Sequence, residues 1–394
     1  MSERRSAFEV FKVALTLGLT AFGGPIAHLG YYERTYVQRR QWVNAEDYAA
    51  ILALTQILPG PASSQTGFLI GWKVGGWPGG LAAWLGFTLP SALLMLAFAL
   101  VQPWLGAAWA QVLLHGLQLA AVAAVGQAVW SMGKRLWVDT PTTAIGLAAA
   151  AVLLVFTAPW LQLAVILAGG AAGLLLRLGG EAAPPLELGI GRRTGAVALA
   201  VFAVLMAGSL AALALSPNSG AAFAGIFYRA GALVFGGGHV VLPLLREALV
   251  PAGWLGDEPF LAGYGAAQAL PGPLFTFAAY LGAVAQPDAP VLWAAIALLA
   301  IFLPGLLLAM AGAPLMAWMS RHPSAGAALA GINAAVVGLL AAALYNPIWT
   351  SAVKSGADVA IAAVAVFLLQ RWRAPPIAAI GVCVVGAVLA GIFR

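Results

Sequence analysis

Long apolar stretches dominate this chain. Residues 81–101, 144–156 and 161–176 contain no charged side chain. A helix needs about 20 apolar residues to cross the hydrocarbon core of a bilayer, so each stretch predicts all or most of a membrane-spanning helix. The pattern predicts an all-α polytopic membrane protein.

Glycine and proline interrupt two other apolar stretches near the start of the chain. Residues 23–25 read Gly-Gly-Pro and residues 59–61 read Pro-Gly-Pro; the arms on either side are residues 8–22, 26–36, 47–58 and 62–73. A helix interior tolerates Pro at a cost of about 3 kcal/mol and Gly at about 1 kcal/mol. Each arm is too short to cross a bilayer alone. Each pair is therefore either one kinked span or a re-entrant hairpin that enters and returns on the same side.

The same interruptions return later in the chain at a nearly constant offset. Phe-Gly-Gly at 22–24 recurs at 235–237, and Pro-Gly-Pro at 59–61 recurs at 271–273. Leu89 and Pro90 recur as Leu303 and Pro304. This ordered series predicts a duplicated chain. We expect a first transport repeat over 1–178, a linker with a connecting transmembrane helix over 179–220, and a second transport repeat over 221–394.

Basic residues in the connections indicate how the repeats are oriented. Cytoplasmic loops of membrane proteins are enriched in Lys and Arg. If both interrupted pairs are re-entrant hairpins, most basic residues fall on one face and the second repeat starts from the opposite face. We therefore expect two inverted-topology repeats with broken or re-entrant helices. The protein would be multi-pass in the cytoplasmic (inner) membrane, with a cytoplasmic N-terminus.

Composition excludes several classes of protein. With 62% hydrophobic and 8% charged residues, the chain is not a soluble globular protein. The net charge is +6, but most Lys and Arg residues fall in short loops beside apolar stretches, as is usual in membrane proteins. The charge therefore does not predict a nucleic-acid partner. The single cysteine, Cys383, allows no disulfide framework, and the four histidines have no metal-ligand spacing. We expect a protein without cofactor that is not an enzyme.

The breaks favour an anion as the ligand. A helix that starts after Pro61 or Pro273 offers unpaired N–H groups and a partial positive charge of about half a unit. Ser63, Ser64 and Thr276 follow these prolines and add hydroxyl donors. A cation site would instead call for a buried carboxylate, which is absent near the breaks in the sequence.

The candidate substrate-binding residues form the breaks or lie beside them. They are Gly23, Gly24, Pro25, His28, Gln56, Pro59, Gly60, Pro61, Ser63, Ser64, Gly236, Gly237, Gly238, His239, Gln268, Pro271, Gly272, Pro273 and Thr276. Each polar member has a structural alternative. The glutamines can join helices, the hydroxyls can bond to their own helix, and the histidines can be satisfied core imidazoles.

Three arginines are candidates for attracting an anion: Arg34, Arg229 and Arg246. Arg34 and Arg246 occupy matching positions in the two halves. The alternative for both is an interfacial side chain that extends its charge to the membrane surface. Arg229 lies within an apolar arm, where a cation is costly unless it has a function or a partner.

The motifs around the breaks resemble one family. GLTAFGGPIAHLG at 18–30 and LTQILPGPASSQTGFLIGW at 54–72 are similar to the N-terminal half of chromate ion transporters. GALVFGGGHVVLPLL at 231–245 and AQALPGPLFTFAAYLG at 267–282 are similar to the C-terminal half. The resemblance covers nearly the whole chain, in the two-domain form of the family. It implies export of chromate, a close analogue of sulfate, and resistance to chromate.

The functional hypothesis is a secondary transporter of tetrahedral oxyanions that works by alternating access at the paired helix breaks. Two alternatives stay open: a transporter of sulfate or another anion, and a passive anion channel. The expected partners are a chromate- or sulfate-type oxyanion and membrane lipid. Whether the protein also forms a homodimer stays open.

Overall fold

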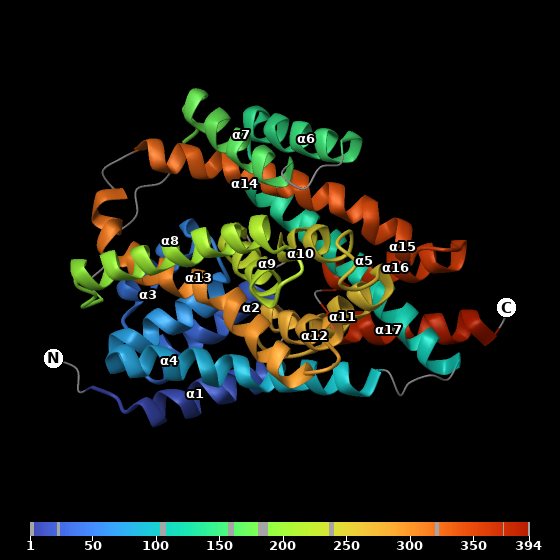
Figure 1. The fold of residues 1–394 in the computed structure, drawn as a ribbon, viewed down its shortest axis with the longest axis horizontal. Coiled ribbons are helices and arrows are strands. Elements are labelled where there is room, and N and C mark those ends of the chain that lie inside the picture. Colours follow the sequence, from blue (N-terminus) through green and yellow to red (C-terminus); the bar gives the residue numbers. More distant parts are fainter. Residues whose placement is uncertain are drawn as a thin grey trace.

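The chain folds as a bundle of α-helices in its computed structural model (Figure 1). The structure describes residues 4–21, 24–102, 108–156, 161–179, 188–235, 240–319, 323–372 and 374–392, and these contain no β-strand. Its helices are α1 (Ala7–Thr20), α2 (Gly24–Tyr32), η1 (Glu33–Arg39), α3 (Ala45–Ile57), α4 (Ala62–Val101), α5 (Ala108–Leu136), α6 (Thr140–Val155), α7 (Leu161–Leu175), α8 (Arg192–Leu215), α9 (Gly220–Leu233), α10 (Val241–Leu249), α11 (Asp257–Ala269), η4 (Leu274–Thr276), α12 (Phe277–Ala285), α13 (Pro290–Met319), α14 (Pro323–Ala343), η5 (Leu344–Trp349), α15 (Thr350–Ala352), α16 (Gly356–Arg371) and α17 (Pro376–Ile392).

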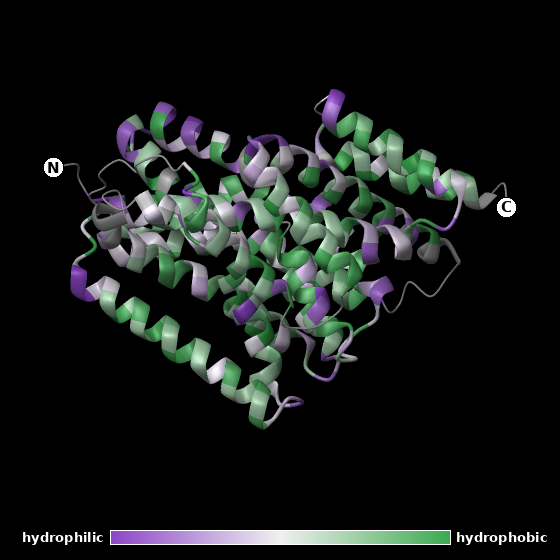
Figure 2. Ribbon diagram, turned by 90° about the horizontal axis from the view of Figure 1, so that it is seen from above, coloured by the Kyte–Doolittle hydropathy of each residue, from purple (hydrophilic) through white to green (hydrophobic). Residues whose placement is uncertain are grey.

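Several of these helices have the length and composition of membrane spans. Among the described residues, four helical segments are long and apolar enough to cross a bilayer: Ala62–Val101, Arg192–Leu215, Pro290–Pro314 and Gly326–Ala352. Figure 2 shows hydrophobic residues along the helices and hydrophilic residues mainly at their ends and connections. The predicted class, an all-α polytopic membrane protein, is confirmed.

The helix α8 illustrates how this class differs from a soluble bundle. Most of its large apolar side chains are exposed, and Val204 has an exposed fraction of 70%. Only small residues of α8, namely Gly195, Ala198 and Ser209, are buried against the rest of the protein. In a bilayer such a surface meets lipid tails, while small residues allow close helix packing.

The helices around the predicted breaks begin and end where the sequence has glycine, proline and capping residues. α1 ends at Thr20 and α2 begins at Gly24, while α3 ends at Ile57 and α4 begins at Ala62. The Ser6 hydroxyl caps α1 by accepting the Glu9 N–H at 3.2 Å, and Asn44 caps α3 in the same way. These side chains satisfy N–H groups that have no partner within their own helix.

The helix α4 consists of two arms that meet at Gly76. This residue has φ 67° and ψ −159°, which is not helical. Gly71 in the first arm lies against Gly79 and Ala83 in the second arm, so the chain turns back on itself. The turn places the start of α4 beside the middle of its own second arm.

The second half of the chain has the same order of elements. α9, α10 and α11 correspond along the sequence to α1, α2 and α3, and α12 and α13 correspond to the two arms of α4. α1 packs along α4, and α9 packs along α13. Duplication and inverted orientation stay predictions, and so do the proposed repeat boundaries.

Candidate functional site

Both Pro-Gly-Pro segments bind the other half of the chain through their central glycine. The Gly60 N–H donates to the Val234 carbonyl at 2.7 Å, and the Gly272 N–H donates to the Ala21 carbonyl at 3.0 Å. Gly60 has φ 121° and Gly272 has φ 96°, values that favour glycine because it has no Cβ. Each accepting carbonyl belongs to the residue before a Phe-Gly-Gly motif. The structure therefore brings the Pro-Gly-Pro segment of each half to the helix end that precedes Phe-Gly-Gly in the other.

The surroundings of these two glycines leave little room for a side chain. A Cβ on Gly60 would lie 2.9 Å from the Gly305 Cα, and a Cβ on Gly272 would lie 2.8 Å from the Ser91 Oγ. Gly305 and Ser91 each follow a proline inside a long helix, α13 and α4 respectively. We call this contact region the central junction; it consists of residues 21, 59–61, 91, 234, 271–273 and 305.

Gln65 is a buried polar residue that bonds to the junction and that the sequence reasoning missed. Its Nε2 donates to the carbonyls of Pro59 and Gly305, both at 2.9 Å, and so fixes the first break against α13. Its side chain is fully buried, whereas the predicted Gln56 is exposed. Gln65 lies one helical turn after Pro61, and this spacing was the signal that could have identified it.

His28 and Ser63, two predicted residues, meet at the start of α4. The His28 Nδ1 lies 3.4 Å from the Ser63 Oγ, and both side chains are buried. The His28 ring contacts the edge of Phe87 at a centroid distance of 5.1 Å. The helix α2 is thereby held against both arms of α4.

The same region contains buried polar atoms that lack a hydrogen-bond partner among the described residues. We call them the unpaired polar cluster; they are His28 Nε2, Tyr32 Oη, Ser64 Oγ, Gln65 Oε1, Trp84 Nε1 and Thr88 Oγ1. All of them belong to α2 or α4. A buried polar group without a partner costs about 1–3 kcal/mol, so these six atoms are the ones in this region that need an explanation.

Two observations bring members of the cluster near each other. The Tyr32 hydroxyl lies against Gly67 in the first arm of α4, one turn after Ser64. The Tyr32 ring contacts Phe87 at 5.3 Å, next to Thr88 in the second arm. Sequence reasoning missed Tyr32, Trp84 and Thr88. Their signal was one-turn spacing within apolar helices, from His28 to Tyr32 and from Trp84 to Thr88.

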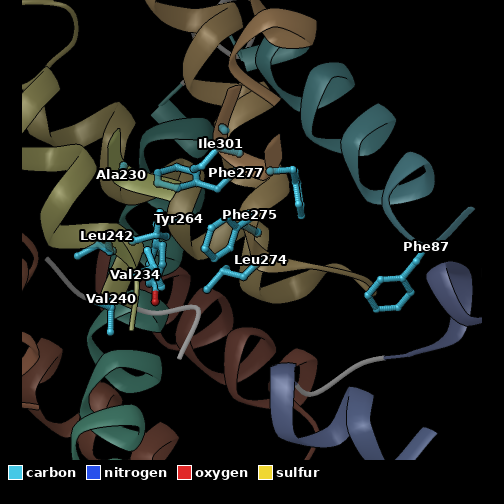
Figure 3. Packing of buried hydrophobic residues seen from close by; sticks show 14 of the residues in the cluster. Phe87, Ala230, Val234, Val240, Leu242, Tyr264, Leu274, Phe275, Phe277 and Ile301 are labelled. Carbon is cyan, nitrogen blue, oxygen red and sulfur yellow. The ribbon is translucent and has the colours of Figure 1, made fainter. Parts of the chain in front are cut away.

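The second half has apolar side chains at the matching positions. Phe275 and Phe277 take the places of Ser63 and Gln65 after the second Pro-Gly-Pro, and both are buried (Figure 3). The one hydroxyl there, on Thr276, donates to the Pro273 carbonyl at 2.9 Å and so bonds to its own segment. Gln268 is half-buried and hydrogen-bonds with Tyr264. Donors are thus concentrated in the first half.

The three predicted arginines lie in different environments. Arg34 lines an open cavity of about 710 Å³ along α1 and η1, which reaches Thr20 at the end of α1. The cavity has one acidic residue and four arginines: Glu9, Arg5, Arg34, Arg39 and Arg40. We call it the basic vestibule, and we define it by these five residues together with Thr16 and Thr20.

The other two arginines are occupied by protein groups. Arg246 makes a bidentate ion pair with Asp257 at 2.8 Å and 3.0 Å. Arg229 donates to the Ser209 carbonyl at 2.7 Å and so connects α9 to α8. Neither residue is brought to the unpaired polar cluster by a contact in the structure.

Several predicted residues belong to parts of the chain with little or no description. Gly23, Gly236, Gly237, Gly238 and His239 lie outside the described residues. Gly24 and Pro25 form the start of α2, without a description of their surroundings. Their assignment to the site stays a prediction.

Comparison with known proteins gives matches over both halves. The family described as chromate transporter matches residues 8–174 and 221–392. A chromate transport protein of Pseudomonas aeruginosa is 31% identical over 346 residues, which cover 85% of this chain and 79% of that protein. A chromate transport protein of Cupriavidus metallidurans is 29% identical over 95% of this chain and 91% of its own length. A probable chromate transport protein of Synechococcus elongatus is 29% identical over 84% and 81%. No solved structure matches the chain.

Proposed function

The chain belongs to the chromate transporter family, and we propose that it exports chromate across the cytoplasmic membrane as a secondary transporter. The relatives that match most of its length are named as transport proteins, which indicates a transporter rather than an enzyme. Sulfate, which has the same tetrahedral shape and charge, would compete for the same site. Export of chromate from the cytoplasm would confer resistance to it.

The observation that carries this proposal is the unpaired polar cluster. A tetrahedral oxyanion presents four acceptor oxygens, so it needs donors from several directions. The hydroxyls of Tyr32, Ser64 and Thr88 and the indole N–H of Trp84 are buried donors of this kind. The first turn of α4 adds N–H groups and the positive end of a helix dipole. Together they support an anion site with neutral donors, built mainly by the first half.

The basic vestibule supports a route to this site. Four arginines against one glutamate create a positive potential that concentrates anions at the mouth. The vestibule extends along α1 to Thr20, next to the first break. With the N-terminus in the cytoplasm, this mouth would collect the substrate from inside the cell.

The direction of transport agrees with the electrical driving force. Moving two negative charges out of a cell that is negative inside is favourable by about 4.6 kcal/mol at 100 mV. Transport against a concentration gradient is therefore compatible with the membrane potential alone. Coupling to protons would add to this force but is not required.

Alternating access would use the central junction. The hydrogen bonds from Gly60 to Val234 and from Gly272 to Ala21 join each half to the other at the breaks. We propose that the two halves rock about these contacts, with each Pro-Gly-Pro segment as a pivot. Such motion opens the site to one face at a time, as in transporters with inverted repeats.

Flux through purified protein in liposomes tests the proposal. We expect saturable chromate flux that follows the imposed voltage and is inhibited by sulfate. Tyr32→Phe removes an unpaired hydroxyl and should raise the chromate concentration at half-maximal flux by about tenfold, because one hydrogen bond to a charged group is lost. The matched control is Tyr280→Phe, whose hydroxyl already donates within the protein, to the Pro259 carbonyl at 3.0 Å.

Three results would contradict the proposal in different ways. Flux that rises linearly with chromate and never saturates would indicate a passive channel. Sulfate transport without chromate transport would indicate a different substrate. An unchanged half-maximal concentration in folded Tyr32→Phe would place the anion site away from the unpaired polar cluster.

A further inference from the structure

A second cavity, with no lining residue in common with the basic vestibule, lies between α5 and α16. Its volume is about 1,020 Å³, and η5 contributes Leu344 and Trp349 to its lining. The lining is mostly apolar, with Val122 on α5, Leu344 on η5, and Val359, Val366 and Phe367 on α16. We call it the α5–α16 groove. It shares no residue with the central junction or the unpaired polar cluster.

The groove runs along the helices rather than into the protein. It extends on α5 from Val122 to Lys134 and on α16 from Val359 to Arg371. At 1.5 Å per residue each of these helical segments is about 18 Å long. One leaflet contributes about 15 Å to the hydrocarbon core of a bilayer, which makes the groove about as long as one lipid acyl chain.

One end of the groove is cationic. Lys134 and Arg371 occupy the last turns of α5 and α16, so their charges lie at the same end. The neighbouring lining residues Ser131 and Gln370 are polar, and no acidic side chain is among the described lining residues. The Lys134 Nζ lies 4.7 Å from the centroid of the Trp130 ring. Ion pairs in the described part of the chain involve neither Lys134 nor Arg371.

The combination of an apolar channel with a cationic end matches one chemical class. An acyl chain is complementary to the apolar lining of the groove, and a phosphate headgroup is complementary to Lys134 and Arg371. Trp130, with an exposed fraction of 54%, has the amphipathic ring that is enriched at the membrane interface. Basic pockets between helices on the cytoplasmic side bind anionic headgroups. We propose that the α5–α16 groove binds one anionic phospholipid, with its headgroup at the end that holds Lys134 and Arg371.

This site would stabilise a part of the protein that the proposed transport cycle does not use directly. α5 and α16 pack on each other and on α17. A bound lipid would fill the groove between α5 and α16 and neutralise the two cations at its end. The proposal stands on the groove alone and does not depend on which anion the protein transports.

Lipid binding to the purified full-length protein tests the proposal. The protein in detergent is titrated with phosphatidylglycerol or phosphatidylcholine, and the bound lipid is counted by native mass spectrometry. We expect one phosphatidylglycerol to bind in preference to phosphatidylcholine. The double variant Lys134→Gln with Arg371→Gln should weaken phosphatidylglycerol binding by roughly thirtyfold, the effect of two surface cations on an anionic lipid.

Two further variants separate the groove from charge in general. Lys354→Gln removes a cation outside the groove, one that is more than half exposed, and should leave lipid binding unchanged. Ala363→Trp fills the groove from an exposed position and keeps both cations; it should also abolish retention of the lipid. The four substituted positions, 134, 354, 363 and 371, are all exposed at the protein surface. The variants should therefore keep the melting temperature of the parent protein without added lipid.

Several results would overturn the proposal. Equal binding of phosphatidylcholine and phosphatidylglycerol would remove the role of the headgroup. Full retention of phosphatidylglycerol by the double variant or by Ala363→Trp would place the lipid elsewhere. A change of oligomeric state in place of a change in lipid binding would make the groove an interface between two copies of the chain.

Discussion

The two halves of this transporter place similar backbone around their breaks and fill it with different side chains. After the first Pro-Gly-Pro come Ser63, Ser64 and Gln65, which are buried. After the second come Phe275 and Phe277, also buried, which pack on other aromatic rings (Figure 3). The hydrogen bond from the central glycine to the opposite half is present in both. The comparison shows that both breaks share the same main-chain contact, whereas the buried polar groups without a partner among the described residues are concentrated in the first half.

The two arginines at matching positions of the halves also differ in their surroundings. Arg34 lines the basic vestibule, while Arg246 at the matching position is paired with Asp257. Arg34 therefore adds positive charge to an open cavity, whereas the charge of Arg246 is neutralised by its partner.

The largest expected effect comes from placing a polar residue of the first half at the matching buried position of the second half. Phe277→Gln introduces the residue found at position 65. It removes a ring that packs 5.2 Å from Phe260 and 5.7 Å from Tyr264 and leaves a buried amide. We expect a loss of about 3–5 kcal/mol of unfolding free energy, the usual cost of truncating a buried aromatic side chain. Thermal unfolding in detergent measures it.

Phe277→Leu is the matched control, because it keeps the position apolar and should cost clearly less. If Phe277→Gln were as stable as the parent protein, the second half would also accommodate polar groups, and the contrast between the halves would fail.

The next effect distinguishes the two central glycines. Alanine at either position is strained by the positive φ, at a cost of about 1–3 kcal/mol. At Gly60 the new Cβ also meets the Gly305 Cα at 2.9 Å. At Gly272 it meets the Ser91 hydroxyl at 2.8 Å, which can move, and the Phe87 carbonyl oxygen at 3.2 Å, which is a looser backbone contact. We expect Gly60→Ala to abolish chromate flux and Gly272→Ala to reduce it.

The Ser91→Gly change sharpens this prediction. Combined with Gly272→Ala it should restore part of the flux, since it removes the side chain that the new Cβ meets. Combined with Gly60→Ala it should restore none. Equal flux through the two alanine variants, at equal amounts of folded protein, would show that the halves respond alike.

A smaller effect separates folding from binding in the first half. Ser64→Ala removes a buried hydroxyl without a partner among the described residues. The protein without substrate should be at least as stable as the parent, because an unsatisfied group is removed. Its gain in melting temperature on addition of chromate should shrink, in line with an affinity about tenfold weaker. A variant that loses stability without substrate and keeps its response to chromate would show that Ser64 serves the fold.

The smallest expected effect comes from replacing either of the two matching arginines, Arg34 and Arg246. Arg34→Gln should raise the KM for chromate severalfold at low ionic strength, and added salt should remove the difference, because screening weakens long-range attraction. Arg246→Gln breaks a partly exposed ion pair and should lower stability by about 1 kcal/mol or less without changing KM. A salt-dependent rise of KM in Arg246→Gln would show that the two arginines act alike on the substrate.

The sequence was sufficient for the features with local causes. Helices stop at Thr20 and Ile57 and resume at Gly24 and Ala62, because glycine and proline act within a few residues of their own position. The membrane class follows from composition and the length of the apolar stretches. The choice of Ser63, Ser64 and His28 as polar residues near the breaks also came from their positions alone.

The features with long-range causes were beyond the sequence. Gln56 and Gln65 lie on opposite sides of the same break, and only the packing of α13 decides that Gln65 is buried and Gln56 is exposed. Asp257 lies across a loop from Arg246, and its pairing depends on how that loop folds. The unpaired polar atoms of Tyr32, Trp84 and Thr88 are recognised by missing partners, which a sequence does not display.

The hydrogen bonds of the central junction have an evolutionary consequence. Both are made by main-chain atoms, so they require no particular functional group at positions 21 and 234. The full burial of Ala21 and Val234 limits the size of these two side chains, and the positive φ favours glycine at positions 60 and 272. Side chains around the breaks can therefore differ in chemistry between the halves without loss of the main-chain contact that joins them. Selection on this contact thus acts on the path of the chain rather than on side-chain chemistry, which leaves the polarity around each break free to change.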